Sequence, residues 1–290
     1  MIIRRLARYG CEVGPTYVNG ALVSRDEAQI SAFDHGLVVG DGVFETVLVD
    51  AGRPFALTRH LERLARSAAG LGLGDVDTDE VRRAVGLVTE AEPLALGRLR
   101  ITLTAGIGPL GSGRLDGPHT LVVAQEPDHV PAPTSKVVVV GYRRNEHGAL
   151  TGLKTTSYAE NALALAQAAR SGADEAVFAN TAGQLCEGTG TNVFFVTDDG
   201  VLHTPPLSSG CLAGITRGLV LELVEVAEDD LPVTAFHPGA IAEAFLTSTL
   251  RDVQAISVID GKAFEVAPGP VTKAAADAFA DLRARTIDPL

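Results

Sequence analysis

The sequence predicts a mixed α/β protein of two domains, and two observations carry this prediction. Short apolar strands alternate with amphipathic helices in both halves of the chain. Between the halves, the segment 127–135 contains three prolines, which are incompatible with a helix or a central strand. We therefore expect a small N-terminal α/β domain at 1–126, an interdomain linker at 127–135 and a larger C-terminal domain at 136–290.

In the first half, turn residues separate the expected strands and apolar periodicity marks two helices. Asn19-Gly20 predicts a tight hairpin turn, because both residues tolerate positive φ. Apolar residues three and four apart predict a helix that begins near Arg59 and a second helix capped by Thr78 or Asp77. The expected elements are strand–turn–strand segments at 16–24 and 42–58, helices from 59 and over 77–91, and strands at 98–106 and 119–125.

The second half is expected to open with an apolar strand and to continue with alternating elements. Its first strand is Lys136–Tyr142, and a helix over 158–171 follows. The remaining expected elements are strands at 175–180, 192–204 and 244–250 and a helix at 214–227.

Composition excludes several classes of protein. The net charge of −12 argues against a nucleic-acid partner. No apolar run approaches the roughly 18 to 20 residues that cross a bilayer, and no apolar segment of a signal peptide follows the basic N-terminus. Cys11, Cys186 and Cys211 are too few and too scattered for a disulfide framework or a metal site. We therefore expect a cytoplasmic protein without a structural metal.

Two familiar motifs occur without their required context. Residues 106–111 fit the pattern G-x-G-x-x-G of dinucleotide-binding loops, but a strand follows them instead of the helix that would bind pyrophosphate. The segment is better interpreted as a long hairpin loop. Asp198-Asp199-Gly200 lacks the alternating ligands of a calcium loop and predicts a hairpin turn.

Lys154 and Glu187 are the first two candidates for chemistry. A lysine before a helix is most often a surface residue, but a partly desolvated lysine can form imines with carbonyl compounds. Glu187 can be interpreted without any chemical role, as a turn residue before a strand. As a functional residue, its carboxylate would keep a pyridine nitrogen protonated.

Two further segments would suit a phosphate group. Gly214-Ile215-Thr216 opens the helix at 214–227, and backbone N–H groups at a helix N-terminus bind anions. Thr247-Ser248-Thr249 places three hydroxyl groups at the end of a strand, although such clusters usually belong to turns. Each signal is weak alone, and together they point to one phosphorylated aromatic cofactor.

The order and spacing of these segments resemble the class IV, fold-type IV enzymes that use pyridoxal 5'-phosphate (PLP). This family includes D-amino acid transaminases, branched-chain transaminases and aminodeoxychorismate lyases. The resemblance covers most of the chain, from about Tyr17 to Lys262. The matching segments are GDGVFET at 40–46, HLERLARSA at 60–68, GLKTTSY at 152–158, CEGTGTNVFFV at 186–196, LAGITR at 212–217 and LTSTLRDV at 246–253.

The resemblance implies roles for individual residues. Lys154 would hold PLP as a Schiff base and carry a proton, Glu187 would bind the pyridine nitrogen, and Arg63 would bind the phosphate. The other expected cofactor contacts are Leu212 against the ring and Gly214, Ile215, Thr216, Ser248 and Thr249 around the phosphate. The family also implies a homodimer and a larger domain with a barrel-like sheet and flanking helices.

The substrate side departs from each subgroup of the family. Phe44, Leu110 and Ser112 occupy positions where D-amino acid transaminases of the bacillus type carry a carboxylate clamp of Tyr, Arg and His. Arg100 matches an arginine of branched-chain transaminases. We expect these four positions to bind substrate. Arg114 is a further candidate for the substrate carboxylate, from a glycine-rich loop that is expected to be mobile.

Three functions remain open on the sequence. The favoured one is a transaminase that moves an amino group between a D-, small or branched amino acid, or a primary amine, and a 2-keto acid. The alternative is 4-amino-4-deoxychorismate lyase, which releases pyruvate and 4-aminobenzoate. A third function, ligand binding without catalysis, would not need Lys154 and Glu187 together.

Overall fold

The computed structural model describes residues 14–290 and divides the chain into two compact units, which are described separately. Unit 1 contains the chain as far as Val130, together with Lys154–Ser157 and Leu290. Unit 2 contains Pro131–Leu153 and Tyr158–Pro289. The fold is mixed α/β, as the sequence predicts. Lys154 thus belongs to the unit formed mainly by the first half of the chain.

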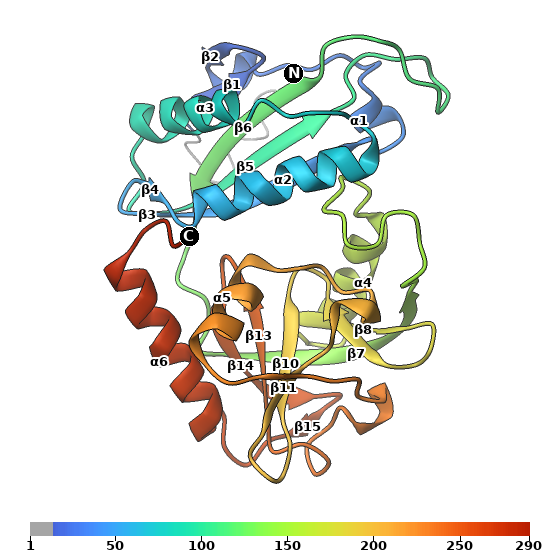
Figure 1. Cartoon of the computed structure of the whole chain (residues 1–290), viewed down its shortest axis with the longest axis vertical. Helices are drawn as coiled ribbons and strands as arrows, with labels where there is room; N and C mark the ends of the chain where they lie inside the picture. Colours follow the sequence, from blue (N-terminus) through green and yellow to red (C-terminus); the bar gives the residue numbers. More distant parts are fainter. Residues whose placement is uncertain (1–13) are drawn as a thin grey trace. The chain divides into compact units, whose positions relative to one another are not determined.

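Unit 1 is built on a six-stranded sheet in the order β2-β1-β6-β5-β3-β4, with every neighbouring pair antiparallel. Helices α2 and α3 lie against one face of the sheet (Figure 1), and their apolar side chains share a core with it. The strands are β1 (Thr16–Val18), β2 (Ala21–Val23), β3 (Gly42–Asp50), β4 (Arg53–Pro54), β5 (Leu96–Thr104) and β6 (Thr120–Pro127). The helices are α1 (His35–Val38), α2 (Leu57–Leu71) and α3 (Thr78–Ala91), with a 3-10 turn at Arg25–Glu27.

Local chemistry sets several boundaries in unit 1. Asn19 and Gly20 have φ of 45° and 97°, which is the backbone of a tight hairpin turn and confirms the predicted β1–β2 hairpin. Asp77 caps α3 by accepting a hydrogen bond of 2.9 Å from the N–H of Glu80. Residues 105–119 join β5 to β6, so the glycine-rich segment is a hairpin loop as predicted.

Unit 2 is built on a nine-stranded sheet in the order β12-β11-β10-β13-β14-β7-β8-β9, and β15 pairs with β14. The sheet is curled, as the predicted barrel-like form requires. Its strands are β7 (Thr134–Arg144), β8 (Glu175–Asn180), β9 (Leu185–Gly188), β10 (Asn192–Val196), β11 (Leu202–Thr204), β12 (Ala227–Glu228), β13 (Glu243–Ser248), β14 (Asp252–Ile259) and β15 (Lys262–Ala263). The helices are α4 (Ala159–Arg170), α5 (Ile215–Leu223) and α6 (Pro270–Arg285), with 3-10 turns at Leu207–Ser209 and Val233–Ala235.

Two boundaries and one helix in the second half of the chain differ from the prediction. The helix expected over 214–227 ends at Leu223, because Val224 is extended and residues 227–228 pair with β11 as β12. The expected linker is shorter, since β6 extends to Pro127 and β7 begins at Thr134. Helix α6, which the sequence analysis did not predict, begins with Pro270 in its first turn and packs against β13 and β14.

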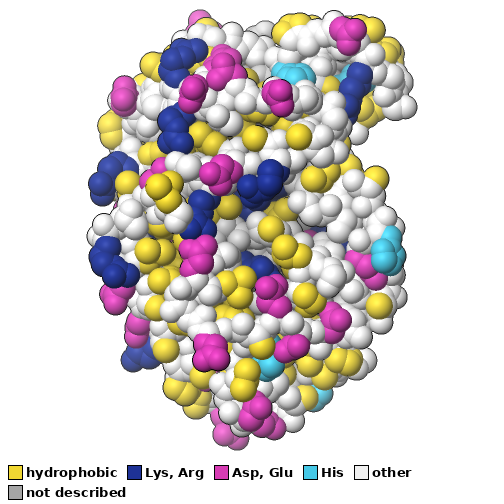
Figure 2. Space-filling model, viewed as in Figure 1, with side chains coloured by type: hydrophobic (Ala, Val, Ile, Leu, Met, Phe, Trp, Pro, Cys, Tyr) yellow, Lys and Arg dark blue, Asp and Glu magenta, His cyan; other side chains and the backbone are white. Residues whose placement is uncertain are grey.

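The described residues include two of the three cysteines. Cys186 and Cys211 are free and buried, and burial raises the pKa of both thiols, to about 11 for Cys211. Cys11 and the basic N-terminal segment lie outside the described residues. On the face shown in Figure 2, Asp and Glu side chains are scattered among those of Lys and Arg. Within residues 14–290, no helix has both the length and the apolar character that a bilayer span needs.

Substitution of Leu99 by Ala tests the core of unit 1. Leu99 lies on β5 and is completely buried in the cluster shared with α2 and α3, so Leu99→Ala should lower the free energy of unfolding by about 2 to 5 kcal/mol. Leu22→Ala, at a side chain that is 40% exposed, should change it by less than about 0.5 kcal/mol. Urea denaturation followed by circular dichroism measures both. Equal effects would contradict the placement of Leu99.

Candidate active site

The backbone of Lys154 is fixed by the edge of β3. The N–H of Phe44 donates to the carbonyl of Lys154 at 3.0 Å, and the N–H of Thr156 donates to the carbonyl of Gly42 at 2.8 Å. This edge is open to them because β4 pairs only with the far end of β3. The N–H of Lys154 also donates to Ser67 Oγ of α2 at 3.1 Å. Lys154 is therefore held from two directions.

The side chains of Lys154 and Arg100 meet at one aromatic ring. Lys154 is half-buried, and its Nζ lies 4.3 Å from the centroid of the Phe44 ring. The guanidinium carbon of Arg100 lies 3.3 Å from the same centroid. A cation above a ring is attracted by its electron-rich face. Three residues that the sequence analysis selected, Phe44, Arg100 and Lys154, are thus brought together in unit 1.

Glu45, the next residue on β3, is fully buried beneath α2. Its carboxylate accepts a pair of hydrogen bonds from Arg63, Nε to Oε1 at 2.8 Å and Nη2 to Oε2 at 2.7 Å. His60 Nδ1 lies 2.7 Å from Oε2. Because His60, Arg63 and Ser67 are three and four residues apart, they share one face of α2. The predicted phosphate ligand Arg63 is therefore buried and directs two of its nitrogens to a carboxylate.

The charges of Glu45 and His60 follow from their burial and from their neighbours. Burial alone would raise the pKa of Glu45, but the charge and hydrogen bonds of Arg63, with those of His60, hold it well below its ordinary value. Burial also lowers the pKa of His60, and this outweighs the opposing effect of Glu45. A neutral His60 must donate Nδ1–H, because an ionised carboxylate only accepts. At neutral pH the group consists of one anion, one cation and one neutral imidazole.

In unit 2, Glu187 of β9 has a partner at each carboxylate oxygen. The N–H of Leu212 donates to Oε2 at 2.9 Å, and Nε of Arg144 forms an ion pair with Oε1 at 3.2 Å. Arg144 is itself fixed, because its guanidinium lies 4.3 Å from the Phe178 ring centroid and donates to Glu160 at 2.9 Å. Glu187 and Leu212, which the sequence analysis assigned to one cofactor ring, are therefore in direct contact.

The N-terminus of α5 has the composition of an anion-binding site. Gly214 precedes the helix and offers no side-chain acceptor to the first N–H groups, and Thr216 is buried in the first turn. A Cβ on Gly214 would collide with Asn192, whose Nδ2 donates to the carbonyl of Leu212 at 2.8 Å. Thr247 faces Asn192 across the β10–β13 pair, and its buried Oγ1 has no protein partner. An orphan hydroxyl beside an uncapped helix start fits a phosphate oxygen.

The other predicted residues lie as follows. Ser248 ends β13 and its hydroxyl accepts the N–H of Arg251 at 3.2 Å, Thr249 stands in the next turn, and Ile215 is the first residue of α5. Leu110 and Ser112 are exposed in the β5–β6 loop of unit 1.

Sequence analysis missed Glu45, His60, Arg144 and Asn192. Glu45 carried a usable signal, since a carboxylate inside the apolar strand GVFETVLV needs a buried partner. Arg144 and Asn192 carried none, because their roles depend on strand pairing within unit 2.

Comparison with known proteins identifies the class. A half-buried lysine with a fixed backbone, an arginine-bound carboxylate and an uncapped helix start are each expected of an enzyme that binds a phosphorylated aldehyde cofactor. The model of the family "Amino-transferase class IV" matches residues 42–259. The chain belongs to the class IV aminotransferases, whose members depend on PLP.

Three relatives illustrate the breadth of the family. The chain is 34% identical over 280 residues to a putative branched-chain-amino-acid aminotransferase of Methanocaldococcus jannaschii, covering 93% of this chain and 96% of that protein. It is 28% identical to aminodeoxychorismate lyase of Bacillus subtilis, covering 89% and 91%. It is 29% identical to D-alanine aminotransferase of Bacillus licheniformis, covering 88% and 92%.

Solved structures share the whole fold. The branched-chain aminotransferase of Thermoproteus uzoniensis with norvaline has a TM-score of 0.86 and 28% identity, covering 93% of this chain and 94% of that one. A hypothetical aminotransferase of Mycobacterium tuberculosis in its PLP-bound form has a TM-score of 0.80 and 27% identity, covering 92% and 98%. The predictions of fold-type IV, of the family and of PLP as cofactor are confirmed.

Acid should destabilise unit 1 in two stages because of Glu45 and His60. The folded pKa of each group is depressed, so each contributes stability above its ordinary pKa, 6.5 for His60 and 4.5 for Glu45, and loses it as the pH falls through the folded value. Urea denaturation should therefore show declining stability below about pH 6.5 and a steeper decline below about pH 4.5.

A matched pair of variants assigns this dependence. Glu45→Gln leaves Arg63 buried without its anion and should cost about 3 to 5 kcal/mol at pH 8, with a flatter acid profile. Glu62→Gln, at an exposed position of α2, should reproduce the wild-type profile. An acid profile that Glu45→Gln leaves unchanged would show that other groups govern the decline.

Proposed function

We propose that the protein is a transaminase that moves an amino group between an amino acid and a 2-keto acid, with PLP held covalently by Lys154. The observation that supports this most directly is the fixation of Lys154. Its backbone is bonded to β3 and α2, and its amine lies beside the Phe44 ring near Arg100. A surface lysine needs none of these contacts.

Donor and acceptor groups of unit 2 suit both ends of PLP. For the phosphate, we propose the N–H groups of Gly214, Ile215 and Thr216 and the hydroxyl groups around Thr247–Thr249. In unit 1, Arg63 is the phosphate ligand that we propose from the family resemblance, and Glu45 orients its guanidinium. For the pyridine nitrogen we propose Glu187. The N–H of Leu212 and the Arg144 ion pair support its role by holding its carboxylate in one orientation.

When bound, PLP stabilises the negative charge left on the substrate Cα after its proton departs. The residues of this chain move and hold that proton. Lys154 is the one proposed proton carrier, and Phe44 limits where its amine can swing. Arg100 places a second positive charge beside that ring. Glu45 neutralises Arg63 beneath the strand.

The substrate is proposed to be a D-, small or branched amino acid, and primary amines are a further candidate. Phe44, Arg100, Leu110 and Ser112 are the proposed substrate contacts, and Arg100 is the cation among them. Relatives named branched-chain and D-alanine aminotransferase support this class. Incubating the holoenzyme with a 2-keto acid acceptor and with each of a panel of D- and L-amino acids and amines tests it. The measured product is the keto acid formed from each amino acid, or the aldehyde or ketone formed from each amine.

Aminodeoxychorismate lyase remains a second candidate, because a relative of that name matches 89% of this chain. In both reactions we propose that Lys154 carries a proton. The reactions differ in their products, which are a keto acid for the transaminase and pyruvate with 4-aminobenzoate for the lyase. Pyruvate and 4-aminobenzoate from aminodeoxychorismate, with no amino transfer to any keto acid, would replace the proposed transaminase.

We also propose a cytoplasmic homodimer. Phe33, Leu37, Ile107 and Leu110 of unit 1 are each more than half exposed, and the N–H of Gly108 donates to the carbonyl of Phe33, which places the β5–β6 loop beside α1. Such apolar side chains suit contact with a second copy. Sedimentation velocity of the holoenzyme should give twice the chain mass of 30.1 kDa, and a monomer would refute it.

Substitution of Lys154 tests covalent attachment. Wild-type protein should be yellow with PLP, and borohydride should fix the cofactor to the peptide that contains Lys154. Lys154→Ala should lose the adduct and all turnover, whereas Lys262→Ala, at an exposed residue of β15, should keep both. Peptide mass mapping decides the point, and a label on Lys136, Lys262 or Lys273 would overturn the assignment.

Substitution of Glu187 tests the ring partner. The amide of Glu187→Gln keeps an acceptor for the Leu212 N–H but loses the charge, so PLP should stay bound while turnover falls about 100-fold. Glu225→Gln, an exposed acid in the same unit, is the control. Turnover by Glu187→Gln within threefold of wild type would exclude the proposed role.

A further inference from the structure

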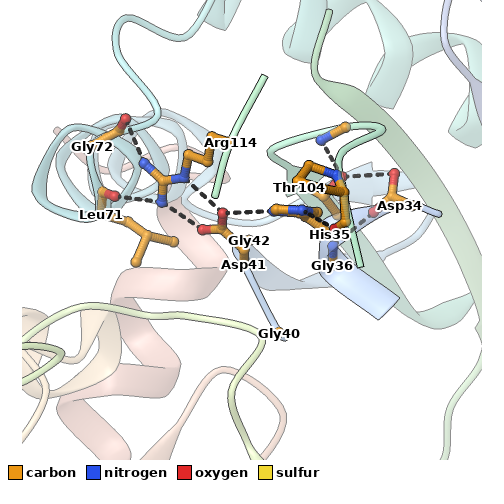
Figure 3. Close-up of polar contacts among 12 residues, drawn as sticks. Asp34, His35, Gly36, Gly40, Asp41, Gly42, Leu71, Gly72, Thr104 and Arg114 are labelled. Atoms are coloured by element: carbon orange, nitrogen blue, oxygen red, sulfur yellow. Dashed lines mark hydrogen bonds and ion pairs between the residues drawn. The ribbon is translucent and has the colours of Figure 1, made fainter. Parts of the chain in front are cut away.

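Arg114 directs four of its five N–H donors at other groups of unit 1. It lies near the end of the β5–β6 loop, and its guanidinium makes four hydrogen bonds (Figure 3). Nε and Nη2 donate to the two carboxylate oxygens of Asp41 at 2.7 and 2.6 Å. Nη1 donates to the carbonyl of Gly72, and Nη2 to that of Leu71, both at 2.9 Å. A pair of parallel hydrogen bonds between a guanidinium and a carboxylate is among the strongest interactions that an arginine side chain forms. The expectation that Arg114 binds the substrate carboxylate is therefore unsupported.

Asp41 joins the loop to the start of β3. Its backbone carbonyl accepts the N–H of Ala105 at 3.0 Å, and its own N–H donates to the carbonyl of His35 at 3.1 Å. Next to it, the carbonyl of Gly42 accepts the N–H of Thr156, two residues beyond Lys154. The hydrogen bonds from Arg114 hold the pKa of Asp41 below its ordinary value, so its charge persists at neutral pH.

The first part of the same loop is anchored to α1. The N–H of His35 donates to the carbonyl of Gly106 at 2.8 Å, and its Nε2 donates to the carbonyl of Pro109 at 2.9 Å. Gly108 must be glycine there, because a Cβ would collide with the His35 ring. Figure 3 shows Asp41 between Arg114 and His35, and the carboxylate of Asp41 lies 3.5 Å from Nδ1 of His35. The glycine-rich loop is therefore fixed at 105–109 and again at Arg114.

Only residues 110–113 lie between these two anchors. They include Leu110 and Ser112, which we propose to contact substrate. A short span held at both ends has little conformational freedom to lose when a substrate binds. Removing one anchor would let residues 110–113 adopt more conformations. Substrate binding would then have to order them, at a cost in conformational entropy.

We propose that Asp41 and Arg114 form a latch that lowers the KM for substrate by positioning the loop, and that Arg114 takes no part in binding the substrate carboxylate. The effect on substrate rests on the proposed function, whereas the latch itself does not. Both residues act through Leu110 and Ser112 and are positioning residues.

Hydrogen exchange of the holoenzyme tests the latch without reference to activity. Exchange at residues 105–115 should rise at least tenfold in Asp41→Asn and in Arg114→Gln, and the double variant should exchange no faster than either single one. Arg98→Gln removes an exposed Arg–Asp pair from β5 of the same unit and should change nothing in the loop. Unchanged exchange in both latch variants would overturn the proposal. Arg114→Lys, which keeps the charge and loses the paired bonds, serves if Asp41→Asn fails to fold.

Steady-state kinetics test the effect on substrate, because the latch should change KM and leave kcat near its wild-type value. The latch predicts that Asp41→Asn and Arg114→Gln raise the KM for amino acids by the same factor, about tenfold for a loss of 1.4 kcal/mol, with kcat within threefold of wild type. A direct role of Arg114 predicts a large rise in KM for Arg114→Gln alone, and that result would refute the latch. If no amino acid is turned over, the proposed function fails, and the exchange data still decide whether the latch exists.

Discussion

The pairing of Lys154–Thr156 with the first residues of β3 is the interaction on which the candidate site depends. Two backbone hydrogen bonds join positions more than a hundred residues apart in the sequence, and they place Lys154 in unit 1 although Leu153 and Tyr158 belong to unit 2. Phe44 takes part twice, with its N–H on the Lys154 carbonyl and its ring beside the Lys154 amine. The backbone of Lys154 is thereby fixed by the edge of β3 and not by α4, the helix that follows it in the sequence.

The charges of unit 1 are arranged around that strand. Alternate residues of a strand point to opposite faces, so Phe44 faces Arg100 and Lys154 while Glu45 faces His60 and Arg63. Glu45 is the buried anion on its side, and it compensates an arginine that would otherwise be costly to bury. Burial lowers the pKa of His60 and keeps its ring uncharged at neutral pH. The negative charge of Glu45 is therefore balanced by the positive charge of Arg63 alone. A phosphate near Arg63 would meet a guanidinium already oriented by Glu45.

Local signals in the sequence predicted what depends on local chemistry. The Asn19-Gly20 turn and the Asp77 cap were found because each is specified within a few residues. The end of α5 was misplaced because residues 227–228 pair with β11, a partner that periodicity cannot show. The assignment of the site relied on family motifs. Glu45 was the one missed residue with a physical signal, and the binding of Arg114 by Asp41 required knowledge of where the β5–β6 loop folds back.

The interleaved chain path of unit 1 affects how the protein is made. Residues 14–130 leave the ribosome before Lys154–Thr156, so the edge of β3 stays unpaired at Gly42–Phe44 until Thr156 has also emerged. An unpaired strand edge is a template for association with other chains, so the nascent protein passes through a stage vulnerable to aggregation. A protein fragment that ends at Val130 would lack Lys154–Ser157, so its β3 edge would stay unpaired. Expression of such a fragment alone would therefore be a poor route to an isolated unit 1.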